Sequence, residues 1–140
     1  DSCVMDLYAG TGSFGLECLS RKASRALFVE NNKEALVNLK KNIVNLNLID
    51  QTTIYSNDVL KFFKNLTLKK KIDLCFLDPP YKNEDYIDII EIIKKKYILN
   101  KKHILVLHRE RGFRNNLLEN LNIIENRVYG RSEIFFLRFF

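Results

Sequence analysis

Short apolar segments alternate with stretches of helical spacing along almost the whole chain. Arg25–Glu30 predicts a strand, and the apolar residues of Lys33–Leu46 recur at the three- and four-residue spacing of a helix. Ile72–Leu77 is apolar except for Asp73, which is typical of a strand that is buried over most of its length. Because strands and helices alternate, the chain is expected to form a mostly parallel sheet covered by helices on both faces.

The remaining segments complete a set of seven expected strands. These strands are Ser2–Tyr8, Arg25–Glu30, Thr52–Ser56, Ile72–Leu77, His103–Leu107, Ile123–Tyr129 and Ile134–Phe140. The expected helices are Ser13–Arg21, Lys33–Leu46, Val59–Leu66 (capped by Asp58), Asp85–Tyr97 and a less defined one near Phe113–Asn120. The short link Gly130–Ser132 predicts a hairpin. The sequence therefore predicts an α/β, doubly wound, Rossmann-like sheet that ends in an antiparallel C-terminal hairpin strand.

The length of the chain suits one domain with one core. Of its 140 residues 46% are hydrophobic and 29% are charged, so residues 1–140 are expected to form a single globular domain, and a monomer. No apolar run approaches the ~20 residues that span a bilayer, which favours a cytoplasmic protein without a membrane partner. A strand-like run follows Asp1 almost at once, so we expect that a segment preceding it is missing.

The cysteines and charges exclude some classes of site. Cys3, Cys18 and Cys75 are odd in number and have no C-x-x-C spacing, so neither a disulfide framework nor a zinc site is indicated, and no metal is expected. The chain also has no Pro-Cys pair, which argues against methylation of a pyrimidine ring carbon by a cysteine nucleophile. The net charge of +6 is compatible with a polyanionic partner but does not establish one.

A glycine-rich segment lies between the first expected strand and the first expected helix. Gly10, Gly12 and Gly15 have G-x-G-x-x-G spacing, which allows a tight turn and close approach of a ligand to the backbone. This context favours a nucleotide cofactor. Asp6 ends the strand, where a carboxylate would repel a pyrophosphate but can face the cationic methionine part of S-adenosylmethionine. A dinucleotide and S-adenosylmethionine are both candidates at this point.

Two further acids follow the next two expected strands. Glu30 closes the second strand, where a carboxylate can accept hydrogen bonds from both ribose hydroxyls of a nucleotide. Asp58 follows the third, where an acid can accept a hydrogen bond from an adenine amino group. Each acid alone could equally be a helix cap or a solvated loop residue. Together with Asp6 they are expected at the sheet edge where open α/β folds bind ligands.

The segment Asp78-Pro79-Pro80-Tyr81 comes directly after the buried apolar run. Two prolines cannot continue a strand, so the chain leaves the sheet in a stiff, extended shape. That shape orients the carboxylate of Asp78 and the carbonyl of Pro79 toward one amino group on an aromatic ring. Tyr81 can stack on the base, which must be unpaired or flipped out. The segment therefore favours methylation of an exocyclic amino group of a nucleic-acid base, achieved by positioning and electrostatics, over a simple rigid turn.

The run from Asp6 to Arg21 resembles the bacterial 16S ribosomal RNA guanine-N2 methyltransferases of the RsmD type, which read D-L-[FY]-A-G-[ST]-G-x-x-G-x-E-A-x-S-R here. The later segments Phe28–Glu30, Asn57-Asp58, Phe76–Tyr81 and Tyr129-Gly130 match in order and spacing, so the resemblance covers nearly the whole chain. It implies a class I methyltransferase fold, S-adenosylmethionine as cofactor, and ribosomal RNA or an assembling small subunit as partner. The implied cofactor-binding residues are Asp6, Ala9, Gly10, Thr11, Gly12, Glu30, Asn31, Asp58 and Val59, and the implied catalytic residues are Asp78, Pro79, Pro80 and Tyr81.

The basic residues divide between the two edges of the expected sheet. The runs Lys69–Lys71, Lys94–Lys96 and Lys101–Lys102 precede strands, so they fall on the edge opposite the glycine loop and are interpreted as a solvated face. The candidates for contact with RNA phosphates follow strands, on the same edge as the glycine loop. They are Lys82, Arg109, Arg111 and Arg131.

Some residues depart from the family pattern. His108 stands at the end of the fifth expected strand, where the resemblance implies an acid, and no proton-transfer role is assigned to it. Cys18 replaces the usual alanine, and the basic N-terminal segment of the family is expected to be missing. Two alternatives stay open: a DNA or RNA adenine amino-methyltransferase, and a non-methylating nucleotide-binding module or dinucleotide oxidoreductase. A DNA enzyme would generally need an added target-recognition domain.

Overall fold

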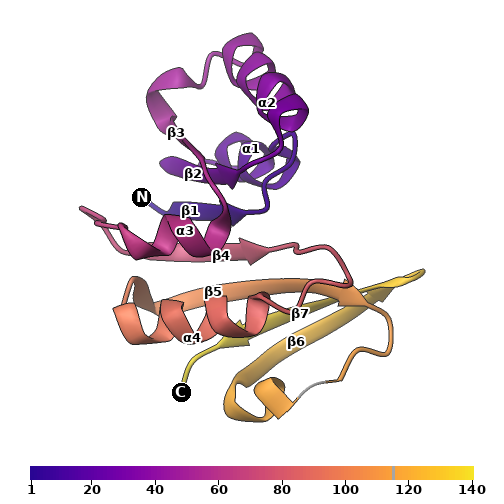
Figure 1. The fold of residues 1–140 in the computed structure, drawn as a ribbon. Coiled ribbons are helices and arrows are strands. Elements are labelled where there is room, and N and C mark those ends of the chain that lie inside the picture. Colours follow the sequence, from indigo (N-terminus) through magenta and orange to yellow (C-terminus); the bar gives the residue numbers. More distant parts are fainter. Residues whose placement is uncertain (115) are drawn as a thin grey trace.

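The computed structural model describes residues 1–114 and 116–140 and contains one seven-stranded sheet (Figure 1). The strands are β1 (Cys3–Leu7), β2 (Arg25–Glu30), β3 (Thr52–Ser56), β4 (Ile72–Leu77), β5 (Leu99–Glu110), β6 (Asn122–Tyr129) and β7 (Ser132–Arg138). The α-helices are α1 (Ser13–Ser20), α2 (Lys33–Asn45), α3 (Val59–Lys64) and α4 (Tyr86–Lys96), and two 3-10 helices are η1 (Ile49–Gln51) and η2 (Asn116–Asn120).

The strands follow the order β3-β2-β1-β4-β5-β7-β6 across the sheet. Strands β1 to β5 pair in parallel, whereas β7 is antiparallel to both of its neighbours, β5 and β6. The link between β6 and β7 is a tight turn at Gly130, which has a φ of 58°. The predicted doubly wound sheet with an antiparallel C-terminal hairpin strand is therefore confirmed.

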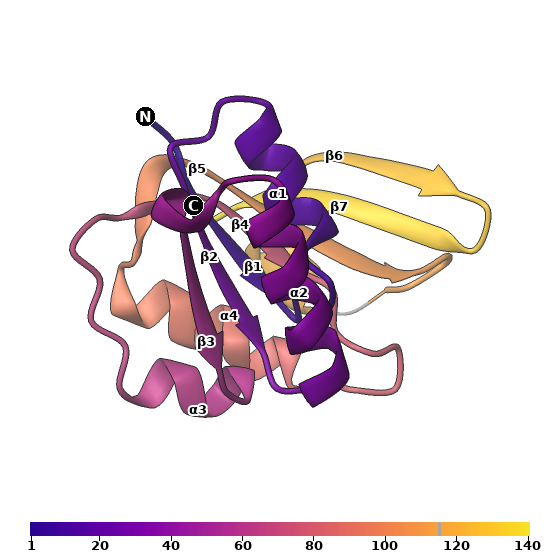
Figure 2. The ribbon, with the colours of Figure 1, turned by 90° about the horizontal axis from the view of Figure 1, so that it is seen from above.

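The helices cover the sheet in two layers, one on each face. Helices α1 and α2 pack on one face through a cluster that includes Leu16, Leu39 and Phe28 of β2. Helices α3 and α4 pack on the other face through a larger cluster that includes Phe63 and Ile90. Figure 2 shows the two pairs of helices on opposite sides of the strands. Among the described residues, no helix has both the length and the apolar character needed to cross a membrane.

The observed elements differ from the expected ones mainly in the second half of the chain. Strand β5 begins at Leu99, four residues before the predicted start, so Lys101 and Lys102 are exposed residues inside the strand instead of preceding it. Its pairing with β4 shifts register between Ile72 and Leu74, which accommodates the added residues. The helix expected near Phe113–Asn120 is only the 3-10 helix η2, and residue 115 of that prediction lies outside the described residues.

The glycine loop joins β1 tightly to α1 and leaves no room for larger side chains at Gly12 and Gly15. Gly12 caps α1 with a φ of 87°, a conformation that side chains rarely adopt, and a Cβ there would lie 2.3 Å from Leu39. A Cβ at Gly15 would lie 2.4 Å from the ring of Phe28. The close approach holds α1 against β2 and so fixes the loop at the carboxyl edge of the sheet.

Candidate active site

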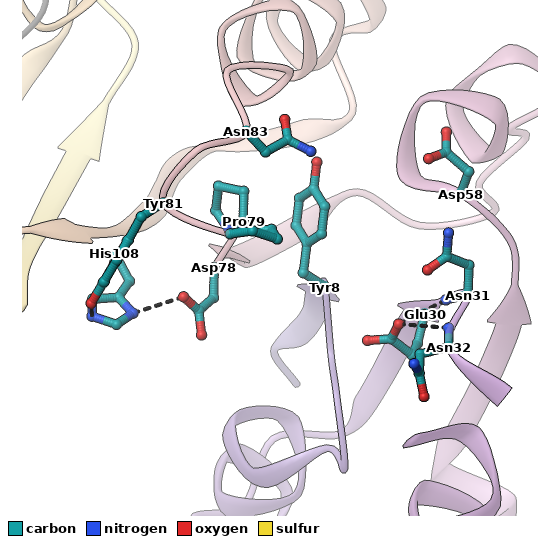
Figure 3. A pocket seen from close by; sticks show the side chains of 11 residues that line it. Tyr8, Glu30, Asn31, Asn32, Asp58, Asp78, Pro79, Tyr81, Asn83 and His108 are labelled. Atoms are coloured by element: carbon teal, nitrogen blue, oxygen red, sulfur yellow. Dashed lines mark hydrogen bonds and ion pairs between the residues drawn. The ribbon is translucent and has the colours of Figure 1, made fainter. Parts of the chain in front are cut away.

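A cavity of about 670 Å³ opens at the carboxyl edge of the sheet. Strands β1 and β4 are neighbours there, and the chain turns from one half of the sheet to the other between them, which is where open α/β folds bind ligands. The side chains around it come from the ends of all five parallel strands (Figure 3). The lining residues are Tyr8, Glu30, Asn31, Asn32, Asp58, Asp78, Pro79, Pro80, Tyr81, Asn83 and His108.

Glu30 lies on the wall of the cavity and ties two loops together. Its Oε2 accepts a hydrogen bond from the backbone N–H of Gly10 at 2.7 Å, and its Oε1 accepts from Asn31 and Asn32 at 2.9 Å each. A carboxylate oxygen has two lone pairs, so Oε2 has room for one more donor while Oε1 is filled. The structure therefore offers one ribose hydroxyl a place on Glu30 without displacing a backbone bond, in contrast to the two that the sequence suggested.

Asp58 and the two asparagines complete this half of the cavity. Asp58 accepts a hydrogen bond from the backbone N–H of Lys61 at 3.1 Å, which confirms its predicted role as the N-cap of α3. Asn32 caps α2 in the same way, through Ala35. The capping uses one oxygen of each side chain. Both Asp58 and Asn31, which lie on the same side of the cavity, still line it (Figure 3).

Asp6 is on the predicted edge but lies behind the glycine loop. Its side chain is 1% exposed, and its Oδ2 accepts a hydrogen bond from the backbone N–H of Gly15 at 3.0 Å. Among the described residues its other oxygen, Oδ1, has no hydrogen-bond partner. Burial raises the pKa of Asp6 to about 7, and the charges of Asp78 and Glu30 add to the rise. Asp6 does not line the cavity, so the direct ligand contact predicted for it is not provided.

The other residues of the predicted cofactor set are not among those that line the cavity. Gly10 has a φ of 59° and open space beyond its Cα, so a ligand can approach its backbone. Thr11 is exposed, Ala9 is held by a backbone bond to Val29, and Gly12 is buried. Val59 is 3% exposed in the core and does not face the cavity.

The predicted catalytic segment forms the opposite wall of the cavity. Asp78 is the first residue after β4, Pro79 is buried, and Tyr81 is 43% exposed. The carboxylate of Asp78 lies 2.7 Å from Nδ1 of His108, measured from Oδ1. His108 Nε2 in turn lies 3.5 Å from the hydroxyl of Tyr81. Figure 3 shows these three side chains at one end of the cavity and Glu30 and Asn31 at the other.

Arg109 corrects the sequence-based prediction most clearly. It was assigned to RNA phosphates, but it is 4% exposed and its guanidinium lies under the catalytic segment. Its Nη2 donates to the carbonyl oxygen of Tyr81 at 2.6 Å, and its Nη1 lies 3.4 Å from the carbonyl oxygens of both Pro79 and Pro80. The prediction of an RNA contact is therefore wrong. Arg109 instead holds the shape of the Asp78–Tyr81 segment from below.

Three side chains of the cavity were not identified from the sequence, namely Tyr8, Asn32 and Asn83, whereas His108 was noted without a proton-transfer role. Tyr8 follows β1 with a φ of 62°, rare for a residue other than glycine, and its ring stands between the two walls (Figure 3). Burial raises the pKa of its hydroxyl to about 12, with contributions from the charges of Asp85 and Asp58. Asn83 comes two residues after Tyr81, and His108 lies two residues before the end of β5. Asn32 comes two residues after the end of β2, and that position is the signal that could have found it.

The remaining basic candidates are exposed on the hairpin side of the cavity. Lys82 follows Tyr81, and Arg131 lies in the β6–β7 turn with 90% of its side chain exposed, 3.4 Å from Glu110. The backbone of Arg111 bonds to the backbone of Arg131, which brings these two residues together. Within the described residues, no three His, Cys, Asp or Glu side chains gather as ligands for a metal ion.

A sequence model of the family described as conserved hypothetical protein 95 matches residues 1–138. The chain belongs to this family. One relative is the ribosomal RNA small subunit methyltransferase D of Buchnera aphidicola (subspecies Acyrthosiphon pisum), 32% identical over 111 residues. That match covers 79% of this chain and 57% of the relative, so the chain spans little more than half of the relative's length.

Solved structures of other proteins, a methylase among them, share the fold of this chain. A conserved hypothetical protein of Streptococcus pyogenes is 28% identical and superposes with a TM-score of 0.87, over 97% of this chain and 85% of that one. The ribosomal protein L11 methylase of Lactobacillus delbrueckii is only 16% identical, but it superposes with a TM-score of 0.75 over 98% of this chain and 69% of that one. This chain therefore has a methyltransferase fold.

Proposed function

We propose that this chain transfers a methyl group from S-adenosylmethionine to the exocyclic N2 amino group of a guanine in small-subunit ribosomal RNA. One observation carries the proposal: a single cavity has strand-end acids suited to an adenosine on one wall and the Asp78-Pro79-Pro80-Tyr81 segment on the other. The relative from Buchnera aphidicola, whose name specifies the small-subunit ribosomal RNA, supports the choice of substrate.

The residues of the first wall fit the cofactor in size and in donor chemistry. The cavity volume of about 670 Å³ lies within the range of small-molecule pockets. Glu30 can accept one ribose hydroxyl at Oε2, Asp58 can accept the adenine amino group, and Gly10 lets the ligand lie against the backbone. The unpartnered Oδ1 of Asp6, buried beneath the loop, attracts positive charge through space. The bound cofactor supplies an electrophilic methyl group on a sulfonium.

The residues of the second wall hold the amino group of the base. The carboxylate of Asp78 and the carbonyl of Pro79 are hydrogen-bond acceptors, and two such bonds draw the amino nitrogen out of conjugation with the ring. Arg109 keeps the segment in one conformation, and its own contact with the Pro79 carbonyl oxygen is weak, at 3.4 Å. Tyr81 is exposed enough to stack on a base that has left its helix. Catalysis is then positioning and electrostatics.

The exposed cations at the hairpin side of the cavity suit an RNA backbone. Lys82, Arg111 and Arg131 lie at the edge of the sheet where the base would enter, and their charges are not buried. Cations in such places bind phosphates through counterion release without reading the sequence. We assign these three cations to RNA binding, and we assign recognition of the methylated nucleotide to the residues of the cavity.

Transfer of labelled methyl groups tests this function. The chain is incubated with labelled S-adenosylmethionine and small ribosomal subunits that lack their methyl groups, and the RNA is then digested to nucleosides. Label in N2-methylguanosine supports the proposal.

An adenine amino-methyltransferase is the second candidate, because Asp78 and Pro79 would hold an adenine N6 amino group in the same way. Label in N6-methyladenosine would therefore support the amino-group mechanism and refute guanine as the substrate. Stabilisation of the chain by NADH but not by S-adenosylhomocysteine, measured by melting temperature, would refute both and favour a nucleotide-binding or oxidoreductase function.

A further inference from the structure

The imidazole of His108 is placed directly against the carboxylate that faces the base. Strand β5 alternates its side chains between the two faces, so His108 points to the face opposite that of Arg109. Its Nδ1 lies 2.7 Å from Oδ1 of Asp78, and the two side chains are 21% and 42% exposed. Both line the cavity. The contact is therefore part of the cavity and not a remote surface pair.

His108 leaves one oxygen of Asp78 available. No other side chain of residues 1–114 and 116–140 hydrogen-bonds to the Asp78 carboxylate, so Oδ1 is held and Oδ2 is not. A carboxylate that pivots about its Cβ–Cγ bond would point its oxygens in varying directions, and a bond to one of them removes this freedom. The ring of Tyr81 lies edge-on to that of His108, with centroids 5.9 Å apart, and steadies the imidazole in turn.

We propose that His108 is a positioning residue for Asp78: its Nδ1–H donates to Oδ1 and so aims Oδ2 at the amino group of the bound base. The inference rests on the proposed function and names a residue that affects the rate of methyl transfer at the same site. It requires a proton on Nδ1 of His108, whose other ring nitrogen, Nε2, lies 3.5 Å from the hydroxyl of Tyr81.

The proton balance of the transfer explains why the orientation of Asp78 affects the rate. As the amino nitrogen forms its bond to the methyl carbon, the carbon–sulfur bond breaks and its electron pair stays with sulfur. The nitrogen then carries a positive charge and loses one proton. Oδ2 of Asp78 accepts both the hydrogen bond before transfer and the proton after it, so an unheld carboxylate would lower the rate of transfer and leave cofactor binding unchanged.

Two substitutions of His108 separate this role from simple packing. In His108→Asn the amide nitrogen can take the place of Nδ1 and donate to Asp78, whereas in His108→Gln the amide extends toward the place of Nε2. His108→Ala removes both. We expect kcat to fall about ten- to a hundredfold in His108→Ala and His108→Gln, to be largely restored in His108→Asn, and the Kd for S-adenosylhomocysteine to stay within about threefold throughout. Wild-type kcat in His108→Ala, or equal losses in the Asn and Gln variants, would overturn the proposal.

The tautomer of His108 can be measured without any turnover. Nitrogen-15 spectra of the imidazoles are compared between the wild-type chain and Asp78→Ala. We expect a proton on Nδ1 of His108 in the wild type and a change of tautomer in Asp78→Ala. The chain has one other histidine, His103, whose Nδ1 lies 2.6 Å from the carbonyl oxygen of Asn100 and whose spectrum should not change. A wild-type His108 whose Nδ1 carries no proton would overturn the proposal.

The failure of the proposed function and the failure of this inference give different results. The kcat values of the His108 variants are compared on whichever nucleoside accepts the label. Label in adenosine would refute guanine as the substrate, and the variants could still be compared on adenosine. If no RNA accepts label, the spectra alone decide for or against the Asp78–His108 bond.

Discussion

The guanidinium of Arg109 donates to the carbonyl oxygen of Tyr81 at 2.6 Å, from below the segment that begins at Asp78. The cation is packed between aromatic rings, with its Cζ 4.6 Å from the ring centre of Tyr86 and 5.3 Å from that of Phe113. A planar group with several donors is required here, because the same side chain also faces the carbonyls of both prolines. The catalytic segment therefore depends on a residue of the neighbouring strand.

Arg109→Lys should damage this support while keeping the charge. A lysine ammonium cannot reach three carbonyls or stack flat on Tyr86, so we expect the free energy of unfolding to fall by about 1–3 kcal/mol. We also expect a lower kcat, because the Pro79 carbonyl and Asp78 lose their fixed positions. Urea unfolding and methyl transfer measure the two effects. Arg21→Lys is the control, since Arg21 forms only an exposed pair with Glu17; equal losses in both variants would contradict the assignment.

Glu30→Ala should weaken cofactor binding more than it slows the chemical step. It removes the acceptor for a ribose hydroxyl and also releases the backbone of Gly10 from the wall of the cavity. We expect the Kd for S-adenosylhomocysteine to rise about tenfold or more in calorimetric titration, with activity partly recovered at high cofactor concentration. Glu34→Ala, an exposed acid in the first turn of α2, is the control. A wild-type Kd in Glu30→Ala would refute this role of Glu30.

The buried carboxyl of Asp6 predicts a pH dependence of stability. Burial raises its pKa from 3.8 to about 7, so between about pH 4 and pH 7 the folded chain binds a proton that the unfolded chain has lost. Stability attributable to Asp6 therefore decreases as the pH rises through this window, by about 4 kcal/mol in total, and stays low above it.

Asp6→Asn isolates this effect, because its Oδ1 can still accept the hydrogen bond from Gly15 but the side chain does not titrate. Urea unfolding at pH 5, 6, 7 and 8 should show a steeper loss of stability with pH in the wild type than in the variant. Identical slopes would mean that Asp6 remains ionised in the folded chain across this range.

Removal of the three exposed cations should weaken RNA binding and reduce its dependence on salt. For the triple variant Lys82→Gln, Arg111→Gln and Arg131→Gln we expect the slope of log K against log salt concentration to decrease by about 2 to 3. The matched control replaces Lys69, Lys70 and Lys71, which lie at the opposite edge of the sheet, with glutamine. Equal effects of the two triple variants would argue for non-specific attraction and against an RNA site at the cavity.

The sequence predicted the fold and the position of the Asp78–Tyr81 segment at the cavity because both depend on local patterns. The run Ile72–Leu77, apolar except for Asp73, favoured a buried strand, and the two prolines after it indicated where that strand ends. The positions of Glu30 and Asp58 followed from parallel pairing, since strand ends meet at one edge. These features required no knowledge of which side chains touch.

The roles of Arg109 and His108 depended on contacts that the sequence pattern does not specify. Both stand near the end of β5, and both are polar, and the position of Arg109 after an expected strand led to its prediction as an RNA contact. The alternation of β5 contained the missing signal: Arg109 shares its face with the buried Leu105 and Leu107, which pack under α4. His108 is on the other face, where Asp78 emerges. Tyr8 was missed because its left-handed backbone has no signature in sequence.

The account depends most on the role of Asp78, which we place on the amino group of the base and not on the cofactor. The most direct test measures two quantities in one preparation of Asp78→Ala: the Kd for S-adenosylhomocysteine and the rate of a single turnover on the RNA that accepts label. Asp88→Ala, an exposed acid of α4, is the control. We predict a Kd within about threefold of the wild type and a rate lowered about a hundredfold or more. A single-turnover rate close to that of the wild type would contradict the amino-group mechanism.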